Sequence, residues 1–117
     1  MVFLHHVKAS KRAEYERWFA EVWAPALRAV AEKRPSARRQ LMAERDLRPM
    51  QATESGDHIY AYLYDPWVTD PGASKRGFPD ALLIEAGRSA EDAKMQADVY
   101  RSLVVRDEGY MFVQKQF

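Results

Sequence analysis

The chain contains no cysteine, only five glycines among 117 residues, and no long uninterrupted hydrophobic run. The lack of cysteine excludes disulfide bonds and thiol chemistry, and it fits a protein of the reducing cytoplasm. No stretch approaches the length needed to span a bilayer, so we expect no membrane anchor. The N-terminus has no basic leader followed by a long apolar segment, so we expect no signal peptide.

An excess of charge of one sign is also lacking. The 18 basic and 17 acidic residues leave a formal net charge of +1. Such a balance provides no electrostatic reason to bind nucleic acid or an anionic membrane surface. The basic clusters Lys33-Arg34 and Arg38-Arg39 are separated by Pro35 and Ser36. We interpret them as a solvated turn.

The most informative stretch that is present runs from His58 to Tyr64. Side chains alternate between the two faces of a strand, which separates three aliphatic residues from an imidazole and three phenols. The polar and aromatic face comprises His58, Tyr60, Tyr62 and Tyr64. We expect the aliphatic face to lie under helices. The tyrosine face is expected to line a cavity or meet a second sheet, because so much aromatic surface is rarely left in water.

Hydrophobic periodicity and turn residues predict the remaining elements. They are a strand at 2–8, an apolar helix from Ser10 to Pro35 with a kink or split near Trp23-Ala24 caused by Pro25, strands at 38–47 and 58–64, helices at 80–86 and 90–103, a turn at 107–109 and a last strand at 110–117. Gly87 is expected to end one helix, and Ser89 with Asp92 forms a capping box that opens the next.

This order of elements predicts an α+β protein with the ferredoxin-like, split βαβ plan. That plan is a four-stranded antiparallel sheet with helices on one face, and we expect it to span residues 1–117 as a single domain. The other sheet face would be bare in a monomer. Two such sheets packed face to face would cover it, so we expect a homodimeric α+β barrel with the tyrosine row inside.

The first helix carries a resemblance to a known family. Tyr15, Phe19, Trp23, Pro25 and Leu27 follow a spacing similar to the aromatic, Trp, His, Pro, Leu pattern of EthD-like proteins, a branch of the dimeric α+β barrel superfamily. Phe19 stands at the tryptophan position of that pattern and Trp23 at its histidine position. The resemblance implies a dimeric barrel. It leaves the chemistry open, because EthD-like proteins include auxiliary factors of ether degradation and enzymes that act on aromatic polyketides.

The candidate catalytic residues are His58 and His5. A histidine beside a phenol could pass a proton near neutral pH, because its unperturbed pKa is about 6.5. Both positions also resemble strand histidines of the stress-responsive barrel proteins. The alternative for each is a hydrogen-bonded structural residue in a half-buried sheet. His5 and His6 point to opposite faces and cannot bind one ion together, so we expect no metal site and no cofactor.

The expected ligand-binding residues are Tyr60, Tyr62, Tyr64, Trp67 and Gln114. Three phenols in a row would suit an oxygenated aromatic ligand, whereas the alternative is a dimer interface in which the tyrosines satisfy one another. Trp67 could cap the cavity mouth, and residues 70–78 have the composition of a lid. The leading hypothesis is an enzyme that acts on a hydrophobic oxygenated compound by proton transfer or by cofactor-independent oxygenation. The rival is a non-catalytic ligand-binding or accessory protein of the same fold.

Overall fold

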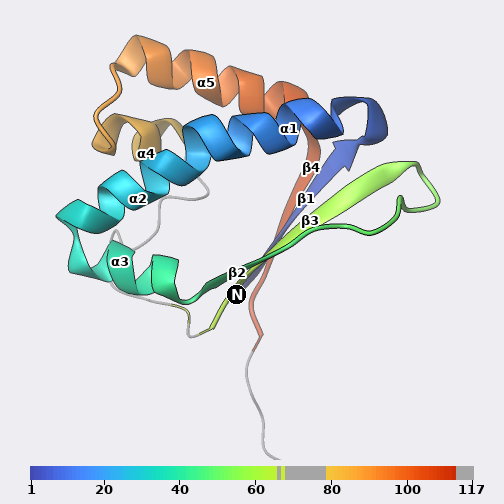
Figure 1. Cartoon of the computed structure of the whole chain (residues 1–117), viewed down its shortest axis with the longest axis horizontal. Coiled ribbons are helices and arrows are strands. Elements are labelled where there is room, and N and C mark those ends of the chain that lie inside the picture. Colours follow the sequence, from blue (N-terminus) through green and yellow to red (C-terminus); the bar gives the residue numbers. More distant parts are fainter. Residues whose placement is uncertain (66, 68–78, 113–117) are drawn as a thin grey trace, which may run out of the picture.

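The computed structural model describes residues 1–65, 67 and 79–112, and within them one four-stranded antiparallel sheet carries the helices on one side (Figure 1). The expected α+β class is confirmed. The strand order β2-β3-β1-β4 is compatible with a ferredoxin-like fold. The strands are β1 (Val2–Lys8), β2 (Glu44–Leu47), β3 (Asp57–Tyr64) and β4 (Val104–Tyr110).

The first helical segment follows β1 directly and is interrupted in its middle. It consists of η1 (Ala9–Lys11), α1 (Arg12–Trp18), the π-helical turn η2 (Phe19–Trp23) and α2 (Ala24–Lys33). Pro25 lies in the first turn of α2, because a proline further inside a helix loses a backbone hydrogen bond and clashes with the preceding turn. The expected split near Trp23-Ala24 is confirmed. Within the described residues, no helix has the length and hydrophobicity needed to cross a membrane.

Two later helix ends follow their local signals. The Ser89 hydroxyl accepts a hydrogen bond from the Asp92 backbone N–H at 3.1 Å and caps α5 (Ala90–Leu103). Gly87 has a φ of 110°, a conformation that strains any residue with a Cβ, and it follows the end of α4 (Pro79–Glu85). Both predictions are confirmed.

The strand expected over 38–47 is wrong in its first half. Helix α3 (Pro35–Met42) occupies that part, and only Glu44–Leu47 is extended. Pro35 favours the first turn of a helix, since its missing N–H would have no intrahelical partner there. Ala37 and Gln40 on one side of α3 are buried, so packing stabilises a helix that the polar sequence alone did not indicate.

The last strand is also displaced from its expected position at 110–117. Strand β4 begins at Val104, directly after α5, and pairs with β1 through the residues expected to turn, Asp107 to Gly109. An edge strand is held by backbone hydrogen bonds to one neighbour and tolerates charged side chains, so hydrophobic alternation did not reveal it. Residues 113–117 lie outside the described part of the chain.

The tyrosine face of β3 lies against the helices, which corrects the expected orientation of this strand. Tyr60, Tyr62 and Tyr64 are only 3%, 3% and 4% exposed. The aliphatic residues between them are half-buried on the other face. Alternation determines which residues share a face, but the aromatic side chains of α1 and η2 decide which face the helices cover. Phe19, for example, stacks on Tyr62 with ring centroids 5.3 Å apart.

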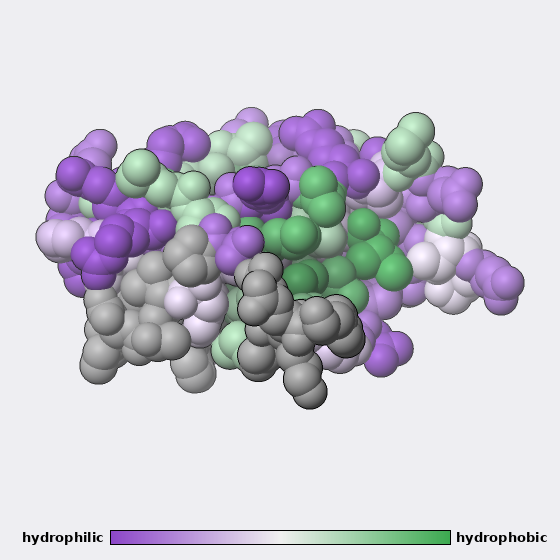
Figure 2. All heavy atoms as spheres, turned by 90° about the horizontal axis from the view of Figure 1, so that it is seen from below, coloured by the Kyte–Doolittle hydropathy of each residue, from purple (hydrophilic) through white to green (hydrophobic). Residues whose placement is uncertain are grey.

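The face of the sheet away from the helices is therefore mainly aliphatic. The register of β1 with β3 pairs Val2 with Leu63, Leu4 with Ala61 and His6 with Ile59 across this open face. Each of these residues is partly buried. Figure 2, which views the molecule from below the sheet, shows hydrophobic side chains gathered in one patch. We call these six residues the open-face patch.

Trp23 provides a test of the packing beneath the helices. It is 3% exposed and stacks on Trp18 with ring centroids 5.8 Å apart. Trp23→Ala should lower the free energy of unfolding by about 3–5 kcal/mol, because it deletes a large buried aromatic side chain. Trp23→His should cost less than alanine but still destabilise, since it leaves a void and buries a polar ring. Urea denaturation measures both.

The matched control is Met95→Ala on α5, where the side chain is 55% exposed and the change should be nearly neutral. A Trp23→Ala protein with an unchanged unfolding midpoint would contradict a packing role for this indole.

Candidate functional site

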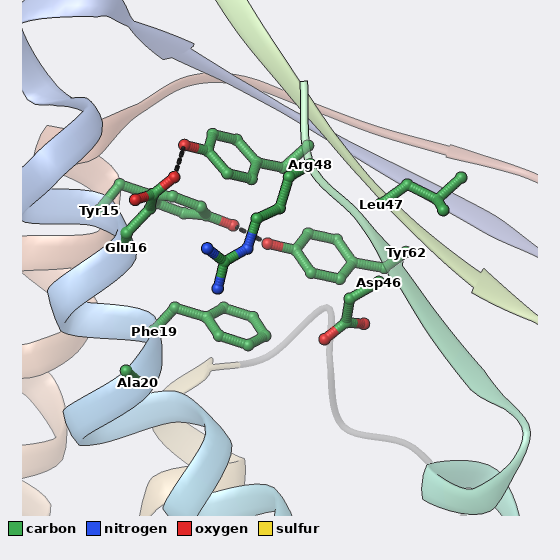
Figure 3. A pocket seen from close by; sticks show the side chains of 9 residues that line it. Tyr15, Glu16, Phe19, Ala20, Asp46, Leu47, Arg48 and Tyr62 are labelled. Atoms are coloured by element: carbon green, nitrogen blue, oxygen red, sulfur yellow. Dashed lines mark hydrogen bonds between the residues drawn. The ribbon is translucent and has the colours of Figure 1, made fainter. Parts of the chain in front are cut away.

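A pocket opens between the first helical segment and strands β2 and β3 (Figure 3). The centres of water molecules can occupy about 100 Å³ of it. One water needs about 10–15 Å³ by this measure, so the pocket suits a group the size of a single ring. It is lined by Tyr15, Glu16, Phe19, Ala20, Asp46, Leu47, Arg48, Tyr60 and Tyr62.

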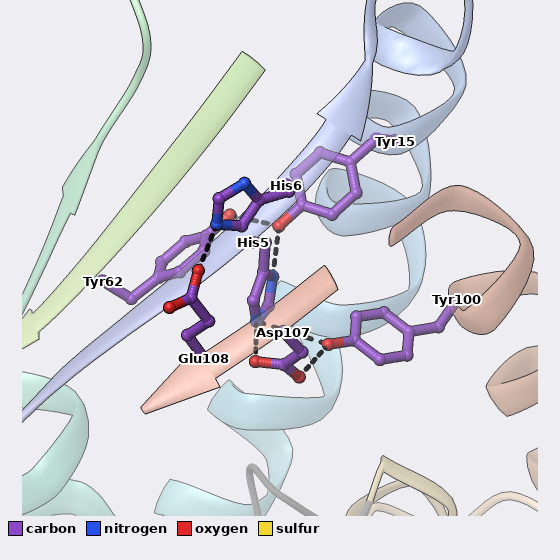
Figure 4. A network of polar contacts seen from close by, with 7 residues as sticks. All are labelled: His5, His6, Tyr15, Tyr62, Tyr100, Asp107 and Glu108. Carbon is purple, nitrogen blue, oxygen red and sulfur yellow. Dashed lines mark hydrogen bonds and ion pairs between the residues drawn. The ribbon is translucent and has the colours of Figure 1, made fainter. Parts of the chain in front are cut away.

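Behind the pocket, a series of hydrogen bonds crosses the core to the far edge of the sheet (Figure 4). The hydroxyl oxygens of Tyr62 and Tyr15 are 2.5 Å apart, and the Tyr15 hydroxyl is 2.8 Å from His5 Nδ1. On the other side of the imidazole, the Tyr100 hydroxyl lies 3.3 Å from His5 Nε2. It also donates to the Asp107 carboxylate at 2.5 Å. We call these five residues the relay.

The sheet register brings the relay together. In antiparallel pairs, residues directly opposite one another share a face. His5 on β1 is opposite Tyr60 on β3 and opposite Asp107 on β4, so all three point toward the helices. Tyr15 reaches the imidazole from α1, and Tyr100 reaches it from α5.

The direction of the relay follows from the single proton that each hydroxyl carries. A carboxylate can only accept, so the Tyr100 proton points to Asp107, and the Tyr100 oxygen is left to accept from His5 Nε2–H. In the neutral imidazole, Nδ1 then accepts from the Tyr15 hydroxyl. Tyr15 has no second proton, so Tyr62 is the donor in their pair. Having given its proton to Tyr15, the oxygen of Tyr62, which lines the pocket, acts as an acceptor toward its other contacts.

The centre of the relay and its outer end differ in their access to solvent. The His5 side chain is 6% exposed, whereas that of Asp107 is 45% exposed. The Asp107 carboxylate also approaches His5 Nε2 to 3.7 Å. A positive charge on the buried imidazole would therefore face a carboxylate that is itself in contact with water.

A second phenol, Tyr60, is held by a different partner at the pocket wall. It donates to the Glu16 carboxylate at 2.7 Å, and Arg12 Nε lies 3.4 Å from the same oxygen. Burial, together with the bond to Glu16, raises the pKa of Tyr60 to about 12. The Tyr60 hydrogen bond is in turn the main reason that the pKa of Glu16 is lowered, and Arg12 contributes to that lowering. Near neutral pH, Tyr60 is a donor and Glu16 an anion.

The expected site residues lie in several different places. His5 is at the centre of the relay, and Tyr60 and Tyr62 line the pocket. Tyr64 instead donates to Glu44 at 2.5 Å, and Trp67 packs against it with ring centroids 5.5 Å apart. The pocket is on the helix side of the sheet, which corrects the expectation that the tyrosine row lines a cavity between two sheets.

His58 and Gln114 are not joined to this arrangement. His58 is on the helix-facing side of β3 but does not line the pocket, and its Nδ1 is buried without a hydrogen-bond partner among the described residues. Gln114 and the expected lid at 70–78 lie outside the residues that the structure describes.

Several residues of the site were not found from the sequence. Tyr15 carried a usable signal, because a phenol on the apolar stripe of a helix needs a polar partner in the core. Asp107 and Tyr100 carried none, since the one lies in a segment expected to turn and the other on an ordinary amphipathic helix. Arg48 follows β2 in a stretch with no regular pattern.

Among residues 1–65, 67 and 79–112, no three His, Cys, Asp or Glu side chains gather as a metal site requires. Comparison with protein-family models, curated proteins and solved structures finds no match. The fold and the site alone thus define the class of this protein, an α+β domain with a ring-sized pocket backed by a buried phenol–imidazole network. The EthD-like resemblance stays a prediction.

The pairing of Tyr60 with Glu16 makes a testable prediction about pH. Because the pKa of Glu16 is lowered in the folded protein, its stabilising contribution is present above the ordinary value of 4.5 and is lost as the pH falls through the lowered pKa. Tyr60→Phe removes the largest cause of that lowering. We expect the pKa of Glu16 to rise in this variant, as measured by NMR titration of the carboxyl carbon.

Tyr110→Phe is the matched control, because Tyr110 donates to a different carboxylate, Glu108 on β4, and its loss should leave the Glu16 titration unchanged. An unaltered Glu16 titration in Tyr60→Phe would mean that the Tyr60 hydrogen bond does not determine the charge state of the pocket wall.

Proposed function

We propose that this protein is an enzyme that removes a proton from the hydroxyl group of a small, hydrophobic, oxygenated compound bound in the pocket. The relay is the observation that carries this proposal. It reaches the pocket at Tyr62, whose oxygen acts as an acceptor once its proton is given to Tyr15, and it contains a buried histidine two hydrogen bonds behind that oxygen.

The proton path follows the direction of the hydrogen bonds. A ligand hydroxyl beside Tyr62 donates its proton to the Tyr62 oxygen as Tyr62 passes its own proton to Tyr15. Tyr15 passes its proton to His5 Nδ1, and the resulting imidazolium is stabilised by Asp107, 3.7 Å from Nε2. A histidine suits this role because the imidazole can accept a proton at one ring nitrogen and donate one from the other. The Nε2 proton then leaves through Tyr100 and the exposed Asp107 carboxylate.

Removal of a hydroxyl proton from an enol or phenol increases the electron density on its ring or on the adjacent carbon. Such a step begins ketonisation, in which that carbon then takes a proton from water, and it likewise begins the isomerisation and cyclisation of an oxygenated aromatic or polyketide-like compound. The aromatic walls at Phe19 and Tyr60 provide the apolar surface for such a ligand.

A non-catalytic ligand-binding protein is the second candidate. The observation in its favour is that the relay is complete without a ligand, since the Tyr62 and Tyr15 hydroxyls already satisfy one another at 2.5 Å. Buried hydrogen-bond networks can also have a purely structural role, because they favour a single packing arrangement of the core. The two candidates differ in whether binding is accompanied by turnover.

The test uses 2-acetylcyclohexanone, a neutral one-ring compound whose enol absorbs in the ultraviolet. The wild-type protein should speed the decay of its enol, and Tyr62→Phe should slow the catalysed rate on the order of 100-fold, the usual contribution of one acid–base group. The Tyr110→Phe variant, which alters a phenol outside the relay, should keep wild-type activity.

Ligand binding is followed in parallel through the backbone amide signals of the pocket residues. If the wild-type protein binds the compound but the enol disappears no faster than in buffer alone, the binding-protein alternative is favoured. Equal rates for the wild type and Tyr62→Phe would reject the relay as the proton path.

We further propose that the protein is a homodimer in which two sheets pack face to face, as in the α+β barrel of split βαβ chains that the EthD-like resemblance implies. The support is the open-face patch, which no helix covers in the described part of the chain and which is apolar at its centre (Figure 2). In this arrangement the aliphatic side chains, and not the tyrosines, lie between the sheets.

Sedimentation at micromolar concentration should give about twice the chain mass of 13.6 kDa. Ala61→Glu should produce a folded monomer, because it introduces a charge at the middle of the open-face patch. The control, Met95→Glu on the outer side of α5, should remain dimeric. A wild-type protein that sediments as a monomer would reject the face-to-face dimer.

A further inference from the structure

We infer that the pocket selects organic anions and that Arg48 holds the carboxylate of a one-ring acid. This inference rests on the proposed function for the position of the ligand, and it adds the chemical class of the compound and the residue that recognises it.

The Arg48 guanidinium is the cation available in this pocket. Its side chain lines the pocket, and Figure 3 shows the guanidinium directed into the space between Glu16, Phe19 and Tyr62. No hydrogen bond or ion pair joins Arg48 to another of the described residues. Arg48 is exposed, so its five N–H donors can exchange water for a ligand.

The other basic side chain near the pocket is already engaged. Arg12 is paired with Glu16 at 3.4 Å and donates to the backbone oxygen of Pro49 at 3.3 Å. Glu16 is balanced by that pair, by the Tyr60 hydroxyl and by the charge of Arg48, which contributes to the lowering of the Glu16 pKa. The remaining carboxylate of the lining, Asp46, is exposed, so water and salt weaken its repulsion of an incoming anion.

The arrangement of side chains around Arg48 also suits a ring that carries a carboxylate. A guanidinium is planar and binds a carboxylate through two parallel hydrogen bonds, which also orients the ring that carries the carboxylate. Phe19 and Tyr62 provide the adjacent aromatic surface, and the Tyr62 oxygen is the acceptor for a second group. The compound class is therefore a cyclic or aromatic carboxylic acid with a separate hydroxyl group.

Three probes of nearly the same shape separate charge from size. They are 4-hydroxybenzoate, the neutral 4-hydroxybenzamide and the cationic 4-hydroxybenzylamine. Binding of each is measured by titration of the amide signals of the pocket residues, in the wild type and in Arg48→Leu, Arg48→Lys and Arg28→Leu. Arg28 on α2 is the control, because it is an exposed arginine that does not line the pocket.

The wild type should bind the benzoate on the order of 10-fold more tightly than the benzamide, the usual effect of hydrogen bonds to a charged group. Arg48→Leu should abolish that preference, because it removes the charge that distinguishes the benzoate from the benzamide. Arg48→Lys should keep part of it, since the charge remains without the planar fork. Arg28→Leu should behave as the wild type does.

Equal affinities for the three probes, tighter binding of the amine, or undiminished benzoate binding by Arg48→Leu would each overturn the anion inference. None of these results touches the proposed proton transfer, because that proposal is tested separately, with an uncharged compound and the Tyr62→Phe variant. Conversely, if the wild-type protein does not turn over 2-acetylcyclohexanone, the proposed function is rejected, and any measured preference for anions still holds.

Discussion

A buried phenol needs a hydrogen-bond partner, and strand β3 directs three of them into the core. The three meet that requirement in two ways. Tyr60 and Tyr64 donate to the carboxylates of Glu16 and Glu44, whereas Tyr62 is paired with the hydroxyl of Tyr15. An unsatisfied hydroxyl in this position would cost about 1–3 kcal/mol, so these partners determine how α1 and the start of β2 lie on the sheet.

The Tyr62 pair has a consequence that the other two lack. A hydroxyl is both donor and acceptor, so the hydrogen bonding continues through Tyr15 to His5 and on to the sheet edge, whereas a carboxylate ends it. Because the surroundings are of low polarity, the bonds of such a network polarise one another. The hydrogen bonds that satisfy the Tyr62 hydroxyl in the core thereby also connect the pocket to a buried imidazole.

The two faces of the sheet have different roles in this arrangement. The helix-covered face contains the aromatic and polar side chains, the pocket and the relay. The open face has an aliphatic centre, with His6 paired to Glu108 beside it. Residues that are neighbours in sequence, such as His5 and His6, thus belong to separate environments, one suited to proton transfer and the other to packing against another apolar surface.

Local sequence patterns were sufficient for much of this protein, because their causes act within a few residues. The period of the His58–Tyr64 strand, the break at Pro25, the Ser89 cap and the Gly87 helix end all follow from backbone geometry and nearby hydrogen bonds. The placement of His5 and His6 on opposite faces follows in the same way. That Tyr60 and Tyr62 share one face of β3 was also within reach of the sequence.

Only the tertiary structure decided which face of β3 the helices cover, since alternation is symmetric and the choice depends on residues far away in the chain, such as Tyr15 and Phe19. It also decided the position of β4, whose charged sequence is held by backbone pairing to β1. The pocket and the relay depend on both of these outcomes, the face that β3 turns to the helices and the position of β4, because together they join β1, β3, β4, α1 and α5. Hydrogen-bonded residues of the relay are up to 95 positions apart, a separation at which no local pattern carries information.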